Sequence, residues 1–247
     1  MKLAVRTAKL AGRLLLENGA ETYRVEDTVK YICDKFGLAE VGVISLPTGT
    51  LYSFVDENGV PRSEVIRTKV RRTNLDVVAR VNDVSRRLME EEMTLEEGYA
   101  QLEELSKVGP QPLWYSVLAN VLSAAFFSLL FGAGWFDFAL AAVCGAMARL
   151  LGLFFSEDSI SSTMYALLAG ALSAVITKAS MAAFGMGNQT AILIGAIMPM
   201  LPGLAFTNAI RDTVNGDLVS GVARTADALL KAVAIAAGVG AVLALWR

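Results

Sequence analysis

Five apolar runs in the second half of the chain constrain its fold more than any other feature. They cover residues 114–131, 136–155, 165–184, 190–206 and 226–246, and each is about as long as the ~20 residues that a helix needs to cross a bilayer. Charge is concentrated before them: 16 of the 22 Lys and Arg residues and 18 of the 24 Asp and Glu residues precede Pro112. The sequence therefore predicts two domains in two solvents, a charged one over residues 1–109 and a transmembrane one over residues 110–247.

The charged region has the patterns of an α+β domain. Helical periodicity predicts helices over residues 3–18, 21–36, 75–92 and 95–107. The segments 41–46, 50–55 and 60–70 are rich in β-branched and aromatic residues and are separated by turn sequences at 47–49 and 56–59, which predicts a small antiparallel sheet. We therefore expect a soluble α+β domain followed by a bundle of five transmembrane helices.

The basic residues near the ends of the apolar runs predict an orientation. With the N-terminus inside, four of them fall on the cytoplasmic side, Arg149, Arg211, Arg224 and Lys231, and only Lys178 and Arg247 fall outside. The first 16 residues lack the continuous apolar core of a signal peptide. We expect an N-inside, C-outside protein of a bacterial or archaeal plasma (inner) membrane, with a cytoplasmic N-terminal domain and with the lipid bilayer as a partner of its apolar helices.

An odd number of spans has a further consequence. A second unit of the same architecture after the C-terminus would begin outside and would therefore be inverted, which is the arrangement of many secondary transporters.

Composition excludes several other classes of function. A net charge of −2 argues against nucleic acid as a partner, because phosphate binding needs an excess of Lys and Arg. The chain has no histidine, which excludes Ser-His-Asp and Cys-His catalysis, and no Gly-rich phosphate loop for ATP. Its two cysteines, Cys33 and Cys144, lie one in each half and suggest no disulfide framework. We expect no metal, no cofactor and no catalytic residue.

The fourth apolar run is interrupted by Pro199 and by Pro202-Gly203. Each proline removes a backbone donor and clashes with the preceding helical turn, so this helix must kink or unwind. Broken helices of this kind build substrate sites in transporters, with the positive end of a half-helix aimed at a carboxylate. The alternative is a kinked structural helix without a ligand, because proline is fairly common in membrane helices.

Polar residues follow this break at helical spacing. Thr207 and Arg211 are neighbours at i,i+4, as are Asn208 and Asp212, so one helix surface presents a hydroxyl, an amide, a guanidinium and a carboxylate. Such a surface suits a zwitterion or a carboxylate, for which arginine offers a planar pair of donors. Alternatively, the basic residues here are only cytoplasmic anchors. The predicted substrate-binding residues are Pro202, Gly203, Thr207, Asn208, Arg211 and Asp212.

Four further polar residues are secondary candidates: Asp217, Ser220, Arg224 and Asn120. Asp217 follows Asn215-Gly216 and also fits the N-cap of the last predicted helix. Asn120 lies in the first apolar run, where a packing contact is the alternative to a role in the pathway.

Three segments resemble the threonine/serine exporter family: residues 17–27 (ENGAETYRVED), residues 47–49 (PTG) and residues 202–224, which include Asn-Ala-Ile-Arg-Asp. The resemblance covers almost the whole chain. In fused members of the family a soluble domain and five spans are followed by five more spans, and this sequence resembles the first half alone, as in the larger component of the split, two-protein form.

The resemblance implies a second, small membrane subunit that supplies the other half of the transport unit. It also implies export driven by the proton-motive force, of threonine and serine or, for split pairs, of succinate and similar dicarboxylates. Arg211 matches the family's arginine in the Asn-Ala-Ile-Arg-Asp stretch, and Asn208, Arg211 and Asp212 are carried over as a site on that match.

The leading hypothesis is therefore a subunit of a secondary exporter that takes a small-molecule substrate and works in a homo- or hetero-oligomer. A second hypothesis is a membrane-anchored enzyme or sensor with its activity in the soluble domain, around residues 21–27. A third is a structural membrane scaffold.

Overall fold

The structure is a computed structural model that describes residues 2–246 except 39, 56–58, 69–71 and 156–158. Most of the predicted turn at 56–59, the end of the predicted third strand and Arg247 lie outside the described residues. The chain forms two compact units. The first contains residues 1–109 and 204–225, and the second contains residues 110–203 and 226–247.

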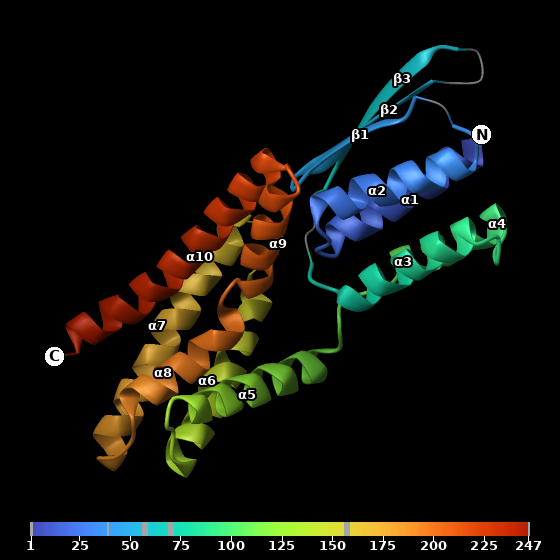
Figure 1. The fold of residues 1–247 in the computed structure, drawn as a ribbon. Coiled ribbons are helices and arrows are strands. Elements are labelled where there is room, and N and C mark those ends of the chain that lie inside the picture. The colour runs from blue at the N-terminus through green and yellow to red at the C-terminus, as the bar shows by residue number, and fades with distance from the viewer. Residues whose placement is uncertain (1, 39, 56–58, 69–71, 156–158, 247) are drawn as a thin grey trace. The chain divides into compact units, whose positions relative to one another are not determined.

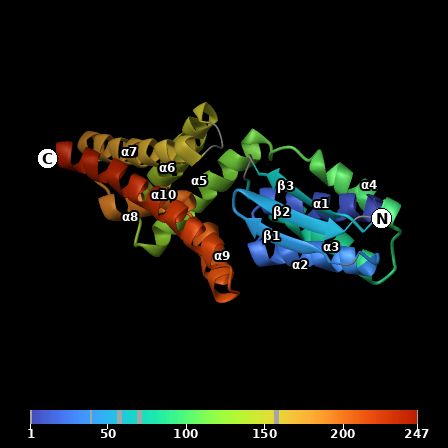
Figure 2. The same ribbon diagram turned by 90° about the horizontal axis from the view of Figure 1, so that it is seen from above.

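The first unit stacks a sheet and two pairs of helices in three layers (Figures 1 and 2). The middle layer is α1 (Lys2–Glu17) with α2 (Thr22–Lys35), and the outer helical layer is α3 (Leu75–Met89) with α4 (Leu95–Ser106). Each helix buries a stripe of small or branched apolar residues, because apolar side chains three or four positions apart share one helical face. Their core includes Ala8, Leu15, Val25, Ile32, Val81, Leu88 and Leu102.

The sheet is an antiparallel meander of β1 (Gly42–Leu46), β2 (Gly49–Val55) and β3 (Pro61–Arg67) in the order β1-β2-β3. β1 and β2 are joined by a turn at Pro47-Thr48, and Gly49 follows it with φ +157°. A Cβ at this glycine would lie 2.5 Å from the carbonyl oxygen of Ile66, so no larger residue fits here. Val43 and Tyr52 face each other across the strands on the buried side of the sheet.

The connection from α3 to α4 is unusual at Glu91. The amide of Glu92 donates to the carbonyl of Arg87 at 3.0 Å, which is the hydrogen bond of a Schellman motif. Glu91 therefore takes the left-handed position that glycine normally occupies, with φ +61°. A residue with a Cβ costs about 1–2 kcal/mol in this conformation. Glu91 lies at the edge of a hollow in the first unit.

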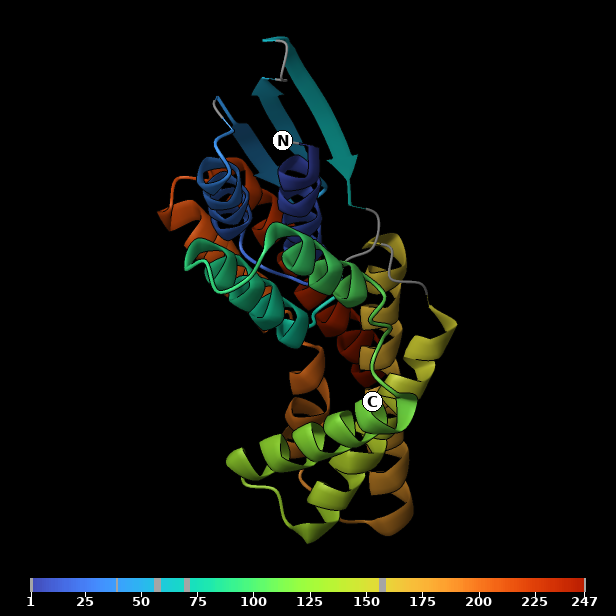
Figure 3. The same cartoon turned by 90° about the vertical axis from the view of Figure 1, so that its right-hand side faces the viewer.

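The second unit consists of α5 (Leu113–Leu130), α6 (Trp135–Leu151), the 3-10 helix η1 (Gly152–Phe154), α7 (Ser159–Phe184), α8 (Gln189–Ile197), the 3-10 helix η2 (Met198–Met200) and the greater part of α10 (Leu218–Leu245). α5 packs on both α6 and α8 (Figure 3), and α6 packs on α7. Most outward side chains are large and apolar, including Phe126, Trp135 and Leu230, as expected for helices in lipid.

Glycines bring these helices together. A Cβ at Gly145 would lie 2.7 Å from the carbonyl oxygen of Asn120, and one at Gly195 would lie 2.6 Å from that of Ala124. A Cβ at Gly238 would approach the carbonyl oxygen of Leu167 to 2.0 Å. Without a hydrophobic driving force between helices in lipid, such close backbone contact contributes much of the packing energy.

The predicted fold class, a soluble α+β N-terminal domain followed by five spans with N inside and C outside, is wrong. The chain is a mainly helical membrane protein with one small sheet, and within its described residues four helices are long and apolar enough to cross a membrane: α5, α6 with η1, α7 and α10. The predicted span at 190–206 is instead two helices that meet at an angle of 55°.

The first unit is also more than an N-terminal domain, because residues 204–225 belong to it. The count of four, or five if the bent pair is one span, does not fix the parity on which the predicted orientation depended.

Candidate functional site

Pro202 sets the place where the fourth apolar run breaks. A residue before proline is pushed out of the helical region, and Leu201 accordingly has φ −64° and ψ 135°. Helix α9 (Gly203–Val214) begins immediately after it. The predicted kink is therefore a complete interruption, and the polar residues that follow it lie on a separate helix.

Helices α9 and α10 form a tight hairpin. Gly216 turns the chain with φ +94°, and the helices then approach so closely that a Cβ at Gly221 would lie 2.1 Å from Thr213 Oγ1. This geometry places the polar residues of α9 beside those of the first turns of α10. Both sets belong to the first unit.

The polar residues of this hairpin bind the turn between α1 and α2. Asn208 Nδ2 donates to the carbonyl of Gly19 at 2.8 Å, and Arg224 Nη2 donates to the carbonyl of Ala20 at 3.0 Å. The amide of Thr22 donates to Asp212 Oδ1 at 2.9 Å. We call this arrangement the latch: residues 19–22 on one side, and Asn208, Arg211, Asp212, Asp217 and Arg224 on the other.

Asp212 has a clear reason to lie where it does. The N-cap of α2, Glu21, makes no side-chain capping bond, so the first amide of that helix is capped by a carboxylate 190 positions away in sequence. Anionic groups are favourable at a helix N-terminus. Asp212 is fully buried and also pairs with Arg224, whose Nε lies 2.9 Å from Asp212 Oδ2. It is a buried charge that is both paired and hydrogen-bonded, as burial of a carboxylate requires.

Arg211 makes a different kind of ion pair. Its Nη1 lies 2.5 Å from Glu21 Oε1, but 54% of its side chain is exposed, whereas only 7% of the Glu21 side chain is. Arg24 binds the other oxygen of Glu21, with Nε at 3.2 Å from Oε2. Two partly exposed guanidinium groups therefore share one buried carboxylate, and a guanidinium has five donors, more than this contact uses.

Two carboxyl groups near the latch have shifted pKa values in opposite directions. Burial alone would raise the pKa of Glu21, but its own backbone amide, Arg211 and Arg24 together lower it below its usual value. Burial raises the pKa of Glu26, and the negative charge of Asp217 adds to this effect, although the amide of Ser45 and Lys30 oppose it. The latch therefore favours a charged Glu21 and disfavours a charged Glu26.

The structure brings together six of the predicted site residues in the first unit: Asn208, Arg211, Asp212, Asp217, Ser220 and Arg224. Asp217 directly precedes α10, where a cap is expected, and its Oδ2 accepts a hydrogen bond from Thr22 Oγ1 at 3.3 Å. Ser220 Oγ donates to the carbonyl of Ser45 at 3.2 Å. Thr207 lies on α9 with them.

The remaining predicted residues belong to the second unit. Pro202 and Gly203 form the break itself. Asn120 donates to the carbonyl of Ser116 one turn earlier in α5, at 3.0 Å, and its own carbonyl lies against Gly145. The first of these contacts lies within α5, and the second lies between α5 and α6.

Two features of the structure, one at the latch and one in the second unit, were missed from the sequence. The contact of residues 19–22 with α9 and α10 was not predicted, although both segments carried the family resemblance, which was the one signal available. Asp137 was not singled out either. It is buried at the start of α6 and accepts from the amides of Gly134 and Asn188 at 2.9 and 2.8 Å, so it joins two loops of the second unit.

Comparison with known proteins identifies the family. The family model described as "Putative threonine/serine exporter" matches residues 6–246. The chain belongs to the threonine/serine exporter family. The resemblance seen in the three sequence segments is thereby confirmed, and the family is one of membrane exporters rather than enzymes.

Two relatives are similar over most of the chain. A protein of Mycobacterium tuberculosis named "Probable threonine/serine exporter" is 21% identical over 241 residues, which are 97% of this chain and 45% of that protein. A protein of Klebsiella aerogenes named "Probable succinate transporter subunit YjjP" is 25% identical over 239 residues, 94% of this chain and 90% of that one. This chain thus spans less than half the length of the mycobacterial relative. No solved structure matches it.

Proposed function

We propose that this chain is a subunit of a secondary exporter, driven by the proton-motive force, of small metabolites that carry a carboxylate. The candidates are threonine and serine, or dicarboxylates such as succinate. The names of the two relatives support these two substrate classes. The observation that carries the proposal is the half-exposed guanidinium of Arg211, which follows a broken apolar helix and lies beside a second arginine.

In this proposal Arg211 binds the substrate carboxylate, because its remaining donors suit that group. Asn208 and Asp212 have a different role: their polar atoms hold the α1–α2 turn, and so they position α9. Pro202, Gly203 and Thr207 are further candidate substrate-binding residues in this proposal; the first two form the break, and Thr207 lies on α9. A carboxylate ligand would compete with Glu21 for Arg211, so Glu21 occupies the site between transport events.

A second membrane subunit completes the transport unit in this proposal, as a homo- or hetero-oligomer. Two observations support it: the relative of nearly equal length is named a subunit, and the mycobacterial exporter is more than twice as long as the region it shares with this chain. We place the protein in the plasma (inner) membrane of a bacterium or archaeon. Residues 1–109 lie in the cytoplasm in this proposal, because Arg211 and Arg224, which adjoin the ends of apolar helices, belong to the same unit.

Efflux measurements test the function. The chain is reconstituted into liposomes with and without co-purifying small membrane proteins, and the vesicles are loaded with labelled threonine, serine or succinate. We expect efflux of at least one substrate that needs the partner and stops when a protonophore collapses the proton gradient. Efflux that is absent for the whole panel, or that is unaffected by the protonophore, would contradict the proposal.

The site is tested by Arg211→Ala in the same vesicles. Loss of one charge-assisted pair with the substrate lowers efflux at limiting substrate by ~10-fold or more. Arg80→Ala is the matched control, because Arg80 forms an exposed ion pair with Asp76 within α3. Unchanged efflux in Arg211→Ala would sink the assignment of this residue.

A further inference from the structure

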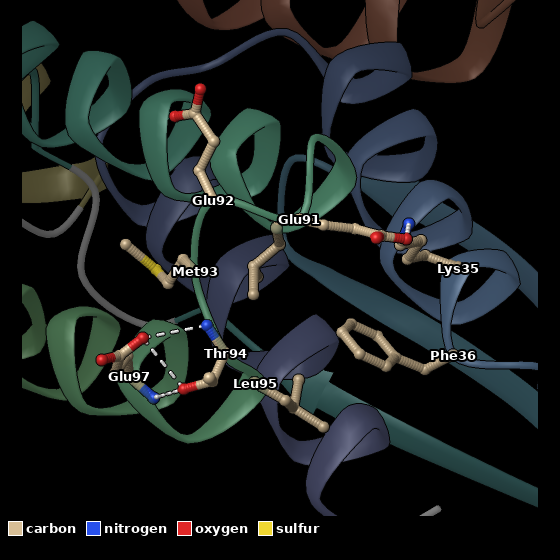
Figure 4. A pocket seen from close by; sticks show the side chains of 9 residues that line it. Lys35, Phe36, Glu91, Glu92, Met93, Thr94, Leu95 and Glu97 are labelled. Atoms are coloured by element: carbon tan, nitrogen blue, oxygen red, sulfur yellow. Dashed lines mark hydrogen bonds and ion pairs between the residues drawn. The ribbon is translucent and has the colours of Figure 1, made fainter.

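A hollow of about 330 Å³ opens in the first unit, where the end of α2 meets the connection between α3 and α4 (Figure 4). It is separate from the latch, and nothing in the proposed transport reaction uses it. Its size falls within the range of small-molecule sites. The residues that define it are Lys35, Phe36, Leu88, Glu91, Met93 and Leu95.

The hollow has an apolar floor and a charged mouth. Leu88 and Met93 are buried in the core beneath it, and Phe36 and Leu95 lie near each other at its side (Figure 4). Lys35 Nζ and Glu91 Oε1 form an ion pair of 2.6 Å at the mouth, between segments 56 residues apart. An apolar cavity with a few convergent charged groups is the usual composition of a ligand site.

Glu91 is held in this place at a cost. It occupies the left-handed position of the Schellman motif, which glycine would occupy without strain. Its ion pair with Lys35 does not offset the free energy of this strained conformation, because 79% of the Glu91 side chain is exposed and exposed ion pairs add little stability. Strained residues of this kind cluster at functional sites. What Glu91 adds to the molecule is a carboxylate at the mouth of the hollow.

The carboxyl group of Glu97 is already used within α4. It accepts from both the amide and the hydroxyl of Thr94, in the capping box at the far side of the hollow (Figure 4). The side chain of Glu92 points away from the hollow in the same view. Lys35 and Glu91 are therefore the pair that a ligand would engage.

We propose that this hollow of the first unit binds an α-amino acid with an aliphatic side chain. The ligand enters between Lys35 and Glu91, so that its carboxylate pairs with the ammonium and its ammonium pairs with the carboxylate. Its side chain rests on Phe36, Met93 and Leu95. An amine without a carboxylate would leave Lys35 unpaired, and a dicarboxylate would meet the negative charge of Glu91.

Binding is measured on the full chain in nanodiscs by isothermal titration, with no transport assay involved, so the result is independent of the proposed export. The probes are L-leucine and its two half-analogues, 3-methylbutylamine and 4-methylpentanoate. Leucine is expected to bind at least ~10-fold more tightly than either, because each analogue loses one charge-assisted pair. Absence of leucine binding, or equal binding of the amine, would overturn the proposal.

Glu91→Gly is the informative variant, because glycine suits the left-handed position and leaves the fold intact while removing the carboxylate. It is expected to unfold at the same or a higher temperature than the natural chain and to bind leucine ~10-fold more weakly, as is Lys35→Met. Arg80→Ala, which removes an exposed ion pair elsewhere, should bind leucine with unchanged affinity. A Glu91→Gly chain that binds leucine as tightly as the natural one would refute the site.

Discussion

At the scale of single residues, the latch combines one buried ion pair with one that is half exposed, and the two should behave differently. Asp212→Ala removes the carboxylate that pairs with the buried guanidinium of Arg224, and it removes the cap of α2. We expect a loss of ~3–5 kcal/mol in the free energy of unfolding, as for other broken buried pairs. The exposed pair of Arg80 and Asp76 is the comparison, and Arg80→Ala should cost no more than ~1 kcal/mol.

Denaturant titration in mixed micelles gives these values. Because both residues of the buried pair act on the same turn, the double variant Asp212→Ala/Arg224→Ala should lose less than the sum of the two single losses. If Asp212→Ala were as mild as Arg80→Ala, the latch would contribute no stability and its description here would be wrong.

Glu26 predicts a pH dependence. Its pKa is raised in the folded protein, so the fold binds this proton more tightly than the unfolded chain does. Its contribution to stability is therefore complete below its ordinary pKa and is lost as the pH rises through the raised value. Glu26→Gln removes this loss while its amide oxygen can still accept from Ser45.

The stability of the natural chain relative to Glu26→Gln should accordingly decrease between pH 4 and pH 7. Thermal unfolding of the two proteins at both pH values measures the difference. A difference that stays constant, or that increases with pH, would contradict the environment assigned to Glu26.

At the scale of helices and strands, most elements could be predicted because their signals are local. The predicted helices 3–18 and 95–107 are α1 and α4, and the predicted strands 41–46 and 50–55 are β1 and β2. Apolar length failed at the fourth run, because an average over 190–206 does not register that Pro202 ends one helix and starts another. The prolines did predict a break in this helix. At such a position the conformational limits of proline decide where a helix ends, and mean hydropathy does not.

Two glycines of α10 test the helix packing of the second unit, because one is in close contact with α7 and the other is in open space. Gly238→Ala on α10 would bring a Cβ to 2.0 Å from the carbonyl oxygen of Leu167, so α7 and α10 must move apart. This overpacking should cost ~1–3 kcal/mol. Gly240→Ala, two residues further on, meets no atom within 4 Å and should be neutral or stabilising by up to ~1 kcal/mol. Equal melting temperatures for the two variants would contradict the helix packing described here.

At the scale of the whole molecule, the decisive feature is that residues 204–225 fold with the first 109 residues. Sequence patterns could not reveal this. The hydrogen bonds between the α1–α2 turn and the hairpin join positions 189 to 204 apart, and no local sequence period reports such a pair. The sequence placed these polar residues on one helix surface, but their partners were found only in the fold. Helix α9, which follows the broken apolar run, is thereby hydrogen-bonded to the α1–α2 turn of the first unit.

If Arg211 binds the transported carboxylate and does not merely hold Glu21, two variants of this ion pair should differ in efflux. Efflux from vesicles containing Glu21→Gln is compared with efflux from vesicles containing Arg211→Ala, since each variant removes the same ion pair. We expect Glu21→Gln to keep most of the efflux, because Arg211 is released for the substrate. We expect Arg211→Ala to lower efflux by ~10-fold or more. Equal losses in the two variants would show that the ion pair is purely structural and would contradict a role of Arg211 in binding the substrate.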